Sequence, residues 1–98
     1  MPYVIITKDK PDSLALRNQV RPVHLEYLVA NQHLLLAAGA QTEDDGSGGS
    51  GGVIILDTED RDTAEKFIAD DPFTKAGLFE NVQVSRWRKA FFNFERLV

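Results

Sequence analysis

The sequence contains no cysteine, no long apolar run and no excess of basic residues. Without cysteine the chain cannot form disulfides, thiolate nucleophiles or cysteine-ligated zinc and iron–sulfur sites. Its apolar stretches are far shorter than the roughly 18 residues that a membrane-spanning helix needs. Eleven Lys and Arg stand against 15 Asp and Glu, whereas nucleic-acid-binding proteins usually present a basic face. We therefore expect no nucleic-acid partner and no membrane anchor.

The composition that remains is typical of one globular domain. The hydrophobic share is 43% and the charged share 27%, which are ordinary values for a soluble protein. A chain of 98 residues can bury one core but not two. We expect a single domain over residues 1–98. The sequence begins without the features of a signal peptide and lacks cysteine, which favours the cytoplasm.

A proline at the start of an apolar pattern marks the predicted first helix. Proline fixes φ and has no N–H, so it is favoured at the first position of a helix. We expect the main helix to begin at Pro22 and end near His33, after a separate helical turn within residues 12–19. Residues at three- and four-residue spacing form its apolar stripe: Leu25, Leu28 and Val29. This stripe is predicted to face the core.

His24 would lie at the edge of that stripe, where it can contact both packed protein and solvent. The ordinary imidazole pKa of about 6.5 suits proton transfer near neutral pH. A lone histidine at such a position is more often structural than catalytic, so both roles stay open at this point. His33, at a helix end, is better suited to interacting with the helix dipole.

Four apolar, β-branched segments are predicted strands, at residues 3–8, 34–41, 53–57 and 82–89. A second helix between the last two would carry Ala64, Phe67 and Ile68 on one side. It would end at Asp71, because the residue before a proline avoids the α region. The order β-α-β-β-α-β predicts an α+β, ferredoxin-like fold, a four-stranded antiparallel sheet with its helices on one face.

The first and third predicted strands are apolar on both faces. Because the helices cover one face only, the other face would be exposed in a monomer. We therefore expect a homodimer in which a second copy covers the open face. The aromatic residues within 90–94 are candidates to seal that interface.

Four segments together resemble the YciI-like, or YCII-related domain, family: Tyr3–Ile5, Arg21–Leu25, Leu36–Gly39 and Asp71–Leu78. The resemblance implies a ferredoxin-like fold in the dimeric α+β barrel superfamily. It also implies a small enzyme with a histidine–aspartate pair, and the matching positions are His24 and Asp71. At least one related protein eliminates chloride from a hydroxylated aromatic ring.

The residues themselves make this pair chemically plausible. If the second helix ran on to Asp71, the carboxylate would point toward the sheet. A carboxylate that accepts from one imidazole nitrogen fixes the tautomer and raises the basicity of the other nitrogen. His24 would then act as a general base or acid. Alternatively, Asp71 before Pro72 is a favourable N-cap for a short following helix, and both roles can coexist.

Two arginines near His24 are candidate substrate-binding residues, because guanidinium groups form bidentate pairs with carboxylates. For Arg17 the preferred interpretation is a solvated charge or an internal salt bridge. For Arg21 the two interpretations are balanced, because it adjoins the predicted helix start. Gly39, one of the residues that carry the resemblance, is a candidate for the pocket wall.

Five of the seven glycines lie within residues 46–52, and six of these residues match G-x-G-x-x-G letter for letter. A dinucleotide site needs a helix after this motif, whereas a strand is predicted here and acidic residues precede it. We expect a loop, for which a mobile lid is the better functional hypothesis. The two histidines and scattered carboxylates match no metal-ligand spacing, so no metal or cofactor is expected.

These observations predict a small homodimeric enzyme that uses His24 and Asp71 for proton transfer. Elimination, isomerisation or hydrolysis of a small organic molecule would need no cofactor. The alternative is a non-catalytic ligand-binding or interaction module that uses the same dimer cavity.

Overall fold

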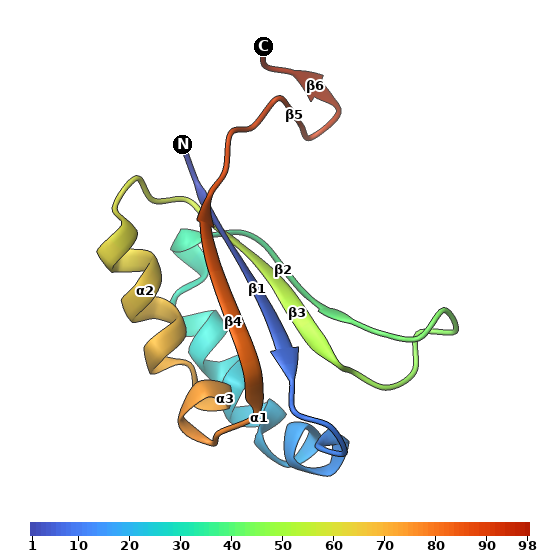
Figure 1. Ribbon diagram of the computed structural model, residues 1–98. Coiled ribbons are helices and arrows are strands. Elements are labelled where there is room, and N and C mark those ends of the chain that lie inside the picture. The colour runs from blue at the N-terminus through green and yellow to red at the C-terminus, as the bar shows by residue number, and fades with distance from the viewer.

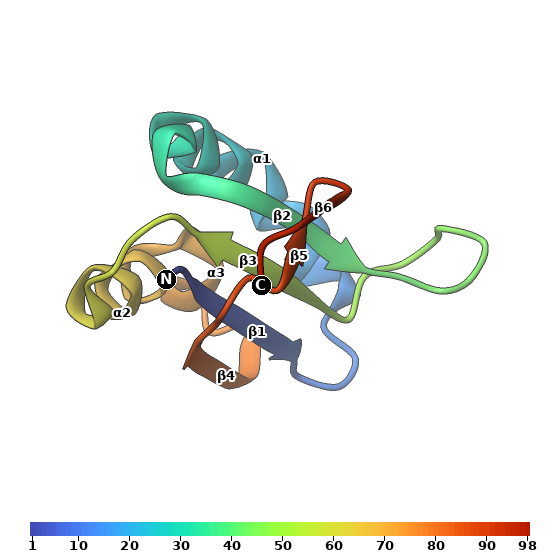
Figure 2. The same ribbon diagram turned by 90° about the horizontal axis from the view of Figure 1, so that it is seen from above.

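The computed structural model describes all 98 residues and consists of a four-stranded antiparallel sheet with helices on one face (Figures 1 and 2). The elements in chain order are β1 (Tyr3–Asp9), α1 (Leu14–Ala30), the 3₁₀ turn η1 (Gln32–Leu34), β2 (Leu35–Gln41), β3 (Gly51–Leu56), α2 (Arg61–Asp70), α3 (Pro72–Lys75), β4 (Phe79–Arg86), β5 (Phe91–Phe92) and β6 (Glu95–Arg96). The strand order β2-β3-β1-β4 is the predicted ferredoxin-like arrangement.

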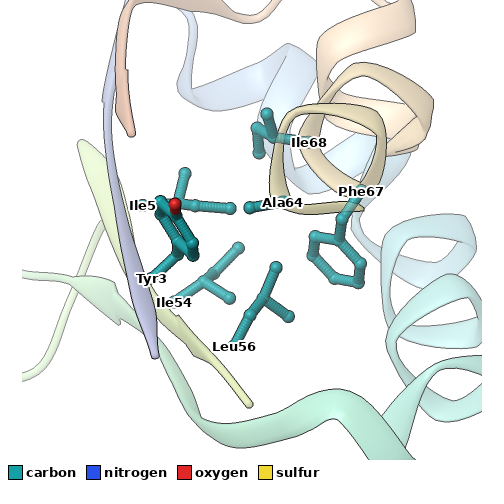
Figure 3. Close-up of a cluster of buried hydrophobic side chains, with 7 residues drawn as sticks. All are labelled: Tyr3, Ile5, Ile54, Leu56, Ala64, Phe67 and Ile68. Atoms are coloured by element: carbon teal, nitrogen blue, oxygen red, sulfur yellow. The ribbon is translucent and has the colours of Figure 1, made fainter. Parts of the chain in front are cut away.

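The core lies between the sheet and α2 (Figure 3). Ile5 of β1 is paired with Ile54 of β3 and Val84 of β4, so these side chains share the helix-facing side. The second helix contributes the predicted apolar side, Ala64, Phe67 and Ile68, all of them buried. Burying a large apolar side chain of this kind stabilises the fold by roughly 1.5–3 kcal/mol.

The prediction for the first helix was wrong at both ends. One continuous helix, α1, spans residues 14–30 with Pro22 inside it, so the separate helical turn predicted within residues 12–19 is absent. The turn that precedes the helix lies at Asp12, whose φ of 55° lies in the left-handed region. A proline inside a helix removes one backbone hydrogen bond, and the exposed position of Pro22 leaves room for the ring.

The predicted apolar stripe of this helix is only partly buried. Leu28 packs against the core, but Leu25 is 39% exposed and Val29 is 65% exposed. Tyr27, which the pattern did not include, packs against the core instead, and its hydroxyl donates a hydrogen bond to the Phe67 carbonyl at 2.8 Å. Relative to the prediction, α1 is therefore rotated about its own axis, so that Tyr27 faces the core in place of Leu25 and Val29.

Two strands are displaced from their predicted bounds. The last strand occupies residues 79–86 rather than 82–89, because Phe79 pairs with Asp9 at the end of β1. The third strand begins at Gly51, so two residues assigned to the glycine loop belong to the sheet. A Cβ on Gly51 would lie 2.2 Å from the Thr7 carbonyl oxygen, so only glycine fits there.

The sheet face opposite the helices carries Val4, Ile6, Val53 and Ile55, as the register pairs Val4 with Ile55 and Ile6 with Val53. The prediction that β1 and β3 are apolar on both faces is thus confirmed. Ile6 is 41% exposed. No helix is long and apolar enough to cross a membrane.

Candidate active site

A pocket of about 290 Å³ lies between α1 and the helix-facing side of the sheet, with α3 at one end. On the sheet side it is lined by the small residues Ala38, Gly39 and Ala40 of β2 and by Gly52 and Ile54 of β3. No large side chain of β2 lines this part of the pocket.

His24 of α1 and Asp71 meet in this pocket. The His24 Nδ1 atom lies 2.9 Å from the Asp71 Oδ1 atom. The Asp71 side chain is completely buried and the His24 side chain is 14% exposed. The two residues are 47 positions apart in the chain, so only the docking of α1 against α3 brings them together.

The hydrogen-bond pattern defines the tautomer of His24. Asp71 Oδ1 also accepts the Phe73 backbone N–H at 2.8 Å, and an ionised carboxylate can only accept toward His24 as well. With a neutral imidazole beside that carboxylate, Nδ1 carries the proton and Nε2 carries a lone pair. No protein group bonds to Nε2, and His24 lines the pocket, so this nitrogen is available to a ligand.

Asp71 has two structural roles at once. The second helix ends at Asp70, and Asp71 has extended backbone angles (φ −61°, ψ 131°). Its side chain caps the short helix α3, which opens at Pro72. The N-cap interpretation and the histidine contact predicted from the sequence are therefore both present, and the cap fixes the carboxylate that orients His24.

Phe73 holds the imidazole ring from one side. The rings of Phe73 and His24 stack with centroids 4.0 Å apart and planes inclined by 18°. The Arg17 guanidinium lies over the same phenyl ring, 4.9 Å from its centroid. The buried Phe73 ring thus fixes His24 and Arg17 in adjacent places.

Arg17 is buried and forms part of the pocket wall. One guanidinium nitrogen, Nη2, donates to the Gly51 carbonyl at 2.8 Å, and Nε lies 3.5 Å from Asp9 Oδ2. The third nitrogen, Nη1, is buried and has no hydrogen-bond partner. The preferred prediction of an internal salt bridge is confirmed, but the residue is not solvated, and it retains a donor.

Asp9 balances this charge from the end of β1. Both of its carboxylate oxygens are buried without a hydrogen bond, although Arg17 lies within ion-pair distance. Burial raises the pKa of Asp9, and the Arg17 charge opposes that rise only in part. Asp9 and Arg17 therefore form a buried pair with unused hydrogen-bonding capacity.

The other predicted site residues also border the pocket. Arg21 lines it from the exposed side of α1 and forms no ion pair within the chain. Gly39 lines it from β2, and nothing lies within 4 Å of the position that a Cβ would take. His33 lies away from the pocket, in the exposed last turn of η1.

Sequence reasoning missed Asp9 and Phe73. The alternation of Tyr3, Ile5, Thr7 and Asp9 on one side of β1 would have placed Asp9 on the helix-facing side. No comparable pattern in the sequence pointed to Phe73, since its stacking on His24 depends on how α3 docks against α1.

No group of three or more His, Cys, Asp or Glu side chains is arranged to hold a metal ion. The glycine-rich segment connects two strands, β2 and β3, as expected. It therefore lacks the following helix whose N-terminus binds a dinucleotide pyrophosphate.

A model of the YCII-related domain family matches residues 1–88. Protein YciI of Escherichia coli O6:H1 is 37% identical, covering 93% of this chain and all of the relative. An uncharacterized protein of Haemophilus influenzae is 34% identical over the same shares. The residues matched by the family model include both His24 and Asp71.

Solved structures agree with the fold. The 5-chloro-2-hydroxyhydroquinone dehydrochlorinase of Burkholderia phenoliruptrix AC1100, solved in complex with 2,5-dihydroxybenzoquinone, is 35% identical with a TM-score of 0.82. That likeness covers 90% of this chain and 94% of that one. An antibiotic biosynthesis monooxygenase, 20% identical with a TM-score of 0.51 over 87% of this chain and 94% of that one, shares the fold alone.

Proposed function

The chain belongs to the YCII-related domain family, and we propose that it is an enzyme whose His24–Asp71 dyad transfers a proton to and from a small organic substrate. The observation that carries this proposal is the 2.9 Å contact between His24 Nδ1 and a fully buried carboxylate. This contact leaves the basic Nε2 atom available to the pocket. A positioned general base of this kind typically contributes about 10²–10⁴-fold to a rate.

The size of the pocket supports a substrate with one ring. A volume of about 290 Å³ is at the lower end of the roughly 300–1,000 Å³ range of small-molecule sites. Leu25, Leu28 and Phe79 provide apolar contacts along the wall. The solved dehydrochlorinase acts on a hydroxylated, chlorinated ring according to its name, which is a compound of suitable size.

The charges of the pocket support an anionic or phenolic substrate. The unpaired Nη1 of Arg17 can donate to a substrate oxygen, and Arg21 adds a second positive charge at the exposed side. A buried donor without a partner strongly stabilises a negatively charged ligand atom that accepts its hydrogen bond. Negative charge that develops on a substrate oxygen would therefore be stabilised beside His24.

The proposed reaction follows from these positions. His24 Nε2 takes a proton from the substrate, and the electron pair of the broken bond stays on the substrate, next to Arg17. In an elimination that pair forms a new double bond and expels a leaving group such as chloride. The protonated imidazole, held by Asp71, then releases its proton, so that HX is lost in total. Isomerisation would return the proton to another substrate atom.

The first test measures chloride release from 5-chloro-2-hydroxyhydroquinone by the wild-type protein and by His24→Gln. Wild type is expected to turn over and the variant to lose at least about 10²-fold. Binding of 2,5-dihydroxybenzoquinone, measured by calorimetry, is expected to persist in His24→Gln. Turnover that survives in the variant would remove His24 from the mechanism. Binding without turnover by wild type would favour the alternative, a ligand-binding module.

A substrate-independent test examines the imidazole itself. Ring ¹⁵N chemical shifts distinguish the two neutral tautomers, and we expect the Nδ1–H form for His24. Asp71→Asn keeps an N-cap residue at this position but removes the charge, so the tautomers are expected to mix. A pure Nε2–H form in the wild-type protein would contradict the proposed base.

We propose further that the active form is a homodimer joined through the open sheet face. Val4, Ile6, Val53 and Ile55 make that face apolar, with Ile6 exposed and the other three half-buried. Exposed apolar surface of this kind usually marks an interaction site. Sedimentation velocity at high micromolar concentration is expected to show a dimer, and a monomer there would contradict the proposal.

A further inference from the structure

The last twelve residues, 87–98, form a C-terminal arm that projects beyond the sheet (Figure 1). The Trp87 N–H donates to the Pro2 carbonyl at 2.9 Å, and after this residue the arm folds on itself. The short strands β5 and β6 pair with each other, and the Leu97 N–H donates to the Ala90 carbonyl at 2.7 Å. Phe92 stacks edge-on against Trp87. The arm is thus a small hairpin.

The hairpin turns its apolar side chains outward. Phe94 is completely exposed (107%) and Phe91 is 67% exposed. The turn holds Asn93 and Phe94 at φ values of 53° and 66°, a left-handed conformation that is unfavourable for a bulky residue. A strained turn that presents an aromatic ring to solvent indicates a contact with another molecule.

The arm and the β2–β3 loop, residues 42–50, carry opposite charges. The arm contains Arg88, Lys89 and Arg96 against one acidic residue, and the loop contains Glu43, Asp44 and Asp45 with no basic residue. None of these six side chains forms an ion pair with an acidic or basic side chain of the chain, although the Arg96 Nε–H donates to the Val98 carbonyl. Hydrogen bonds from Ser47 hold the pKa of Asp45 below its usual value, so the loop charge is maintained.

These two segments lie at opposite ends of the sheet (Figure 1). Arg86, from which the arm continues, pairs with Tyr3 at the start of β1. Gly51, where the loop returns, pairs with Lys8 near the end of β1. The strands between them are about 20 Å long. The charges therefore cannot meet within one chain.

We propose that the C-terminal arm of one copy binds the β2–β3 loop and the adjoining open sheet face of a second copy. In a two-fold dimer with the open faces together and the copies turned end for end, this contact forms twice. The exposed arm phenylalanines would cover apolar residues of the partner's open face, such as Ile6. This inference rests on the homodimer proposed above and identifies the segments that hold it together.

The contact would also connect each arm to the partner's site. Gly48 of the loop lines the pocket, and a Cβ on Gly49 would lie 2.6 Å from Arg17 Nε, so the loop backbone packs directly on that arginine. An arm that holds the loop fixes the pocket wall beside Arg17. The site of one copy is therefore completed by the arm of the other.

A charge-swap experiment tests the contact. The loop variant changes Glu43, Asp44 and Asp45 to Lys, and the arm variant changes Arg88, Lys89 and Arg96 to Glu. Each variant alone is expected to raise the dimer dissociation constant at least about tenfold in sedimentation velocity, since like charges then face each other. In an equimolar mixture both contacts again join opposite charges, so a heterodimer close to wild type in affinity is expected.

The control carries the same charge change on exposed helix positions: Glu26, Asp62 and Glu65 to Lys. It is expected to dimerise nearly as the wild type does. Phe91→Ser with Phe94→Ser removes the apolar part of the arm and is expected to weaken the dimer without lowering the stability of the monomer.

Two results would overturn the inference, and they distinguish a failure of the arm contact from a failure of the homodimer. Dimers that are insensitive to both charge variants, or a mixture that does not restore affinity, would exclude the arm while leaving the homodimer intact. A wild-type protein that stays monomeric at high micromolar concentration would instead exclude the homodimer itself.

Discussion

The two buried aspartates of this chain, Asp71 and Asp9, are held in very different ways. Asp71 is completely buried, and one of its oxygens accepts both the His24 Nδ1–H and the Phe73 backbone N–H. Asp9 is 6% exposed, and its carboxylate forms no hydrogen bond and is ion-paired with Arg17 at 3.5 Å. Hydrogen bonds therefore fix the orientation of the Asp71 carboxylate, whereas the Asp9 carboxylate interacts chiefly through its charge.

This difference indicates different contributions to the site. A carboxylate with directed hydrogen bonds can select a tautomer and orient a ring, which are the requirements for a base. A carboxylate that offers only charge can keep a buried guanidinium in place while leaving its Nη1 atom free for a ligand. Asp71 would then act on the proton transfer itself, and Asp9 on the binding of an anionic oxygen.

The largest expected effect is a difference in kcat between the variants of the two aspartates. Asp71→Asn is expected to lower kcat by about 10²–10⁴-fold, because an amide cannot stabilise the imidazolium. Asp9→Asn is expected to act mainly on KM, by loosening Arg17. Initial rates of chloride release, compared across both variants, provide the measurement. Equal losses of kcat in the two would remove the distinction.

A smaller effect concerns the buried pair. Arg17→Met leaves Asp9 without its counter-charge and is expected to cost about 3–5 kcal/mol of stability at neutral pH. Because the folded-state pKa of Asp9 is already raised and would rise further, the destabilisation should be small at acidic pH and grow as pH increases through that pKa. Urea unfolding of wild type and variant at several pH values measures this dependence.

The double variant Asp9→Asn with Arg17→Met is the control for this experiment. It buries no charge, so its loss of stability is expected to be smaller than that of Arg17→Met and nearly independent of pH. A deficit of the single variant that stays constant from acidic to neutral pH would contradict the ion-pair account.

The smallest expected effect uses Tyr27 as a reporter of the Asp71 charge. Burial, with smaller contributions from the charges of Asp70 and Asp71, raises the pKa of Tyr27 to about 12. Its neutral form therefore stabilises the fold below the usual value near 10, and this contribution is lost as pH rises through about 12. Asp71→Asn is expected to lower this pKa and Asp9→Asn to leave it unchanged. Spectrophotometric titration measures the shift, with Tyr27→Phe to assign the signal.

The strands and the second helix could be predicted because their signals are local. Alternation in β1 and β3, and the spacing of Ala64, Phe67 and Ile68, follow directly from the geometry of a strand and a helix. The prediction for α1 was wrong because it took Pro22 as the first residue of the helix, although a proline is also tolerated inside a helix at an exposed position. The start of α1 follows the turn at Asp12 instead, and the packing of Tyr27 sets which side of the helix faces the core.

The sequence by itself determined the fold class, the family and the candidate pair of His24 and Asp71. These depend on residue types and their order, which are fixed before the chain folds. Only the tertiary structure decided that Asp71 caps α3 and bonds to His24 at once, and that Phe73 stacks on His24. It also decided that Arg17 is buried beside Asp9 with one donor free. These contacts join residues far apart in the chain, so they depend on how α1 and α3 dock on the sheet, which no local pattern encodes.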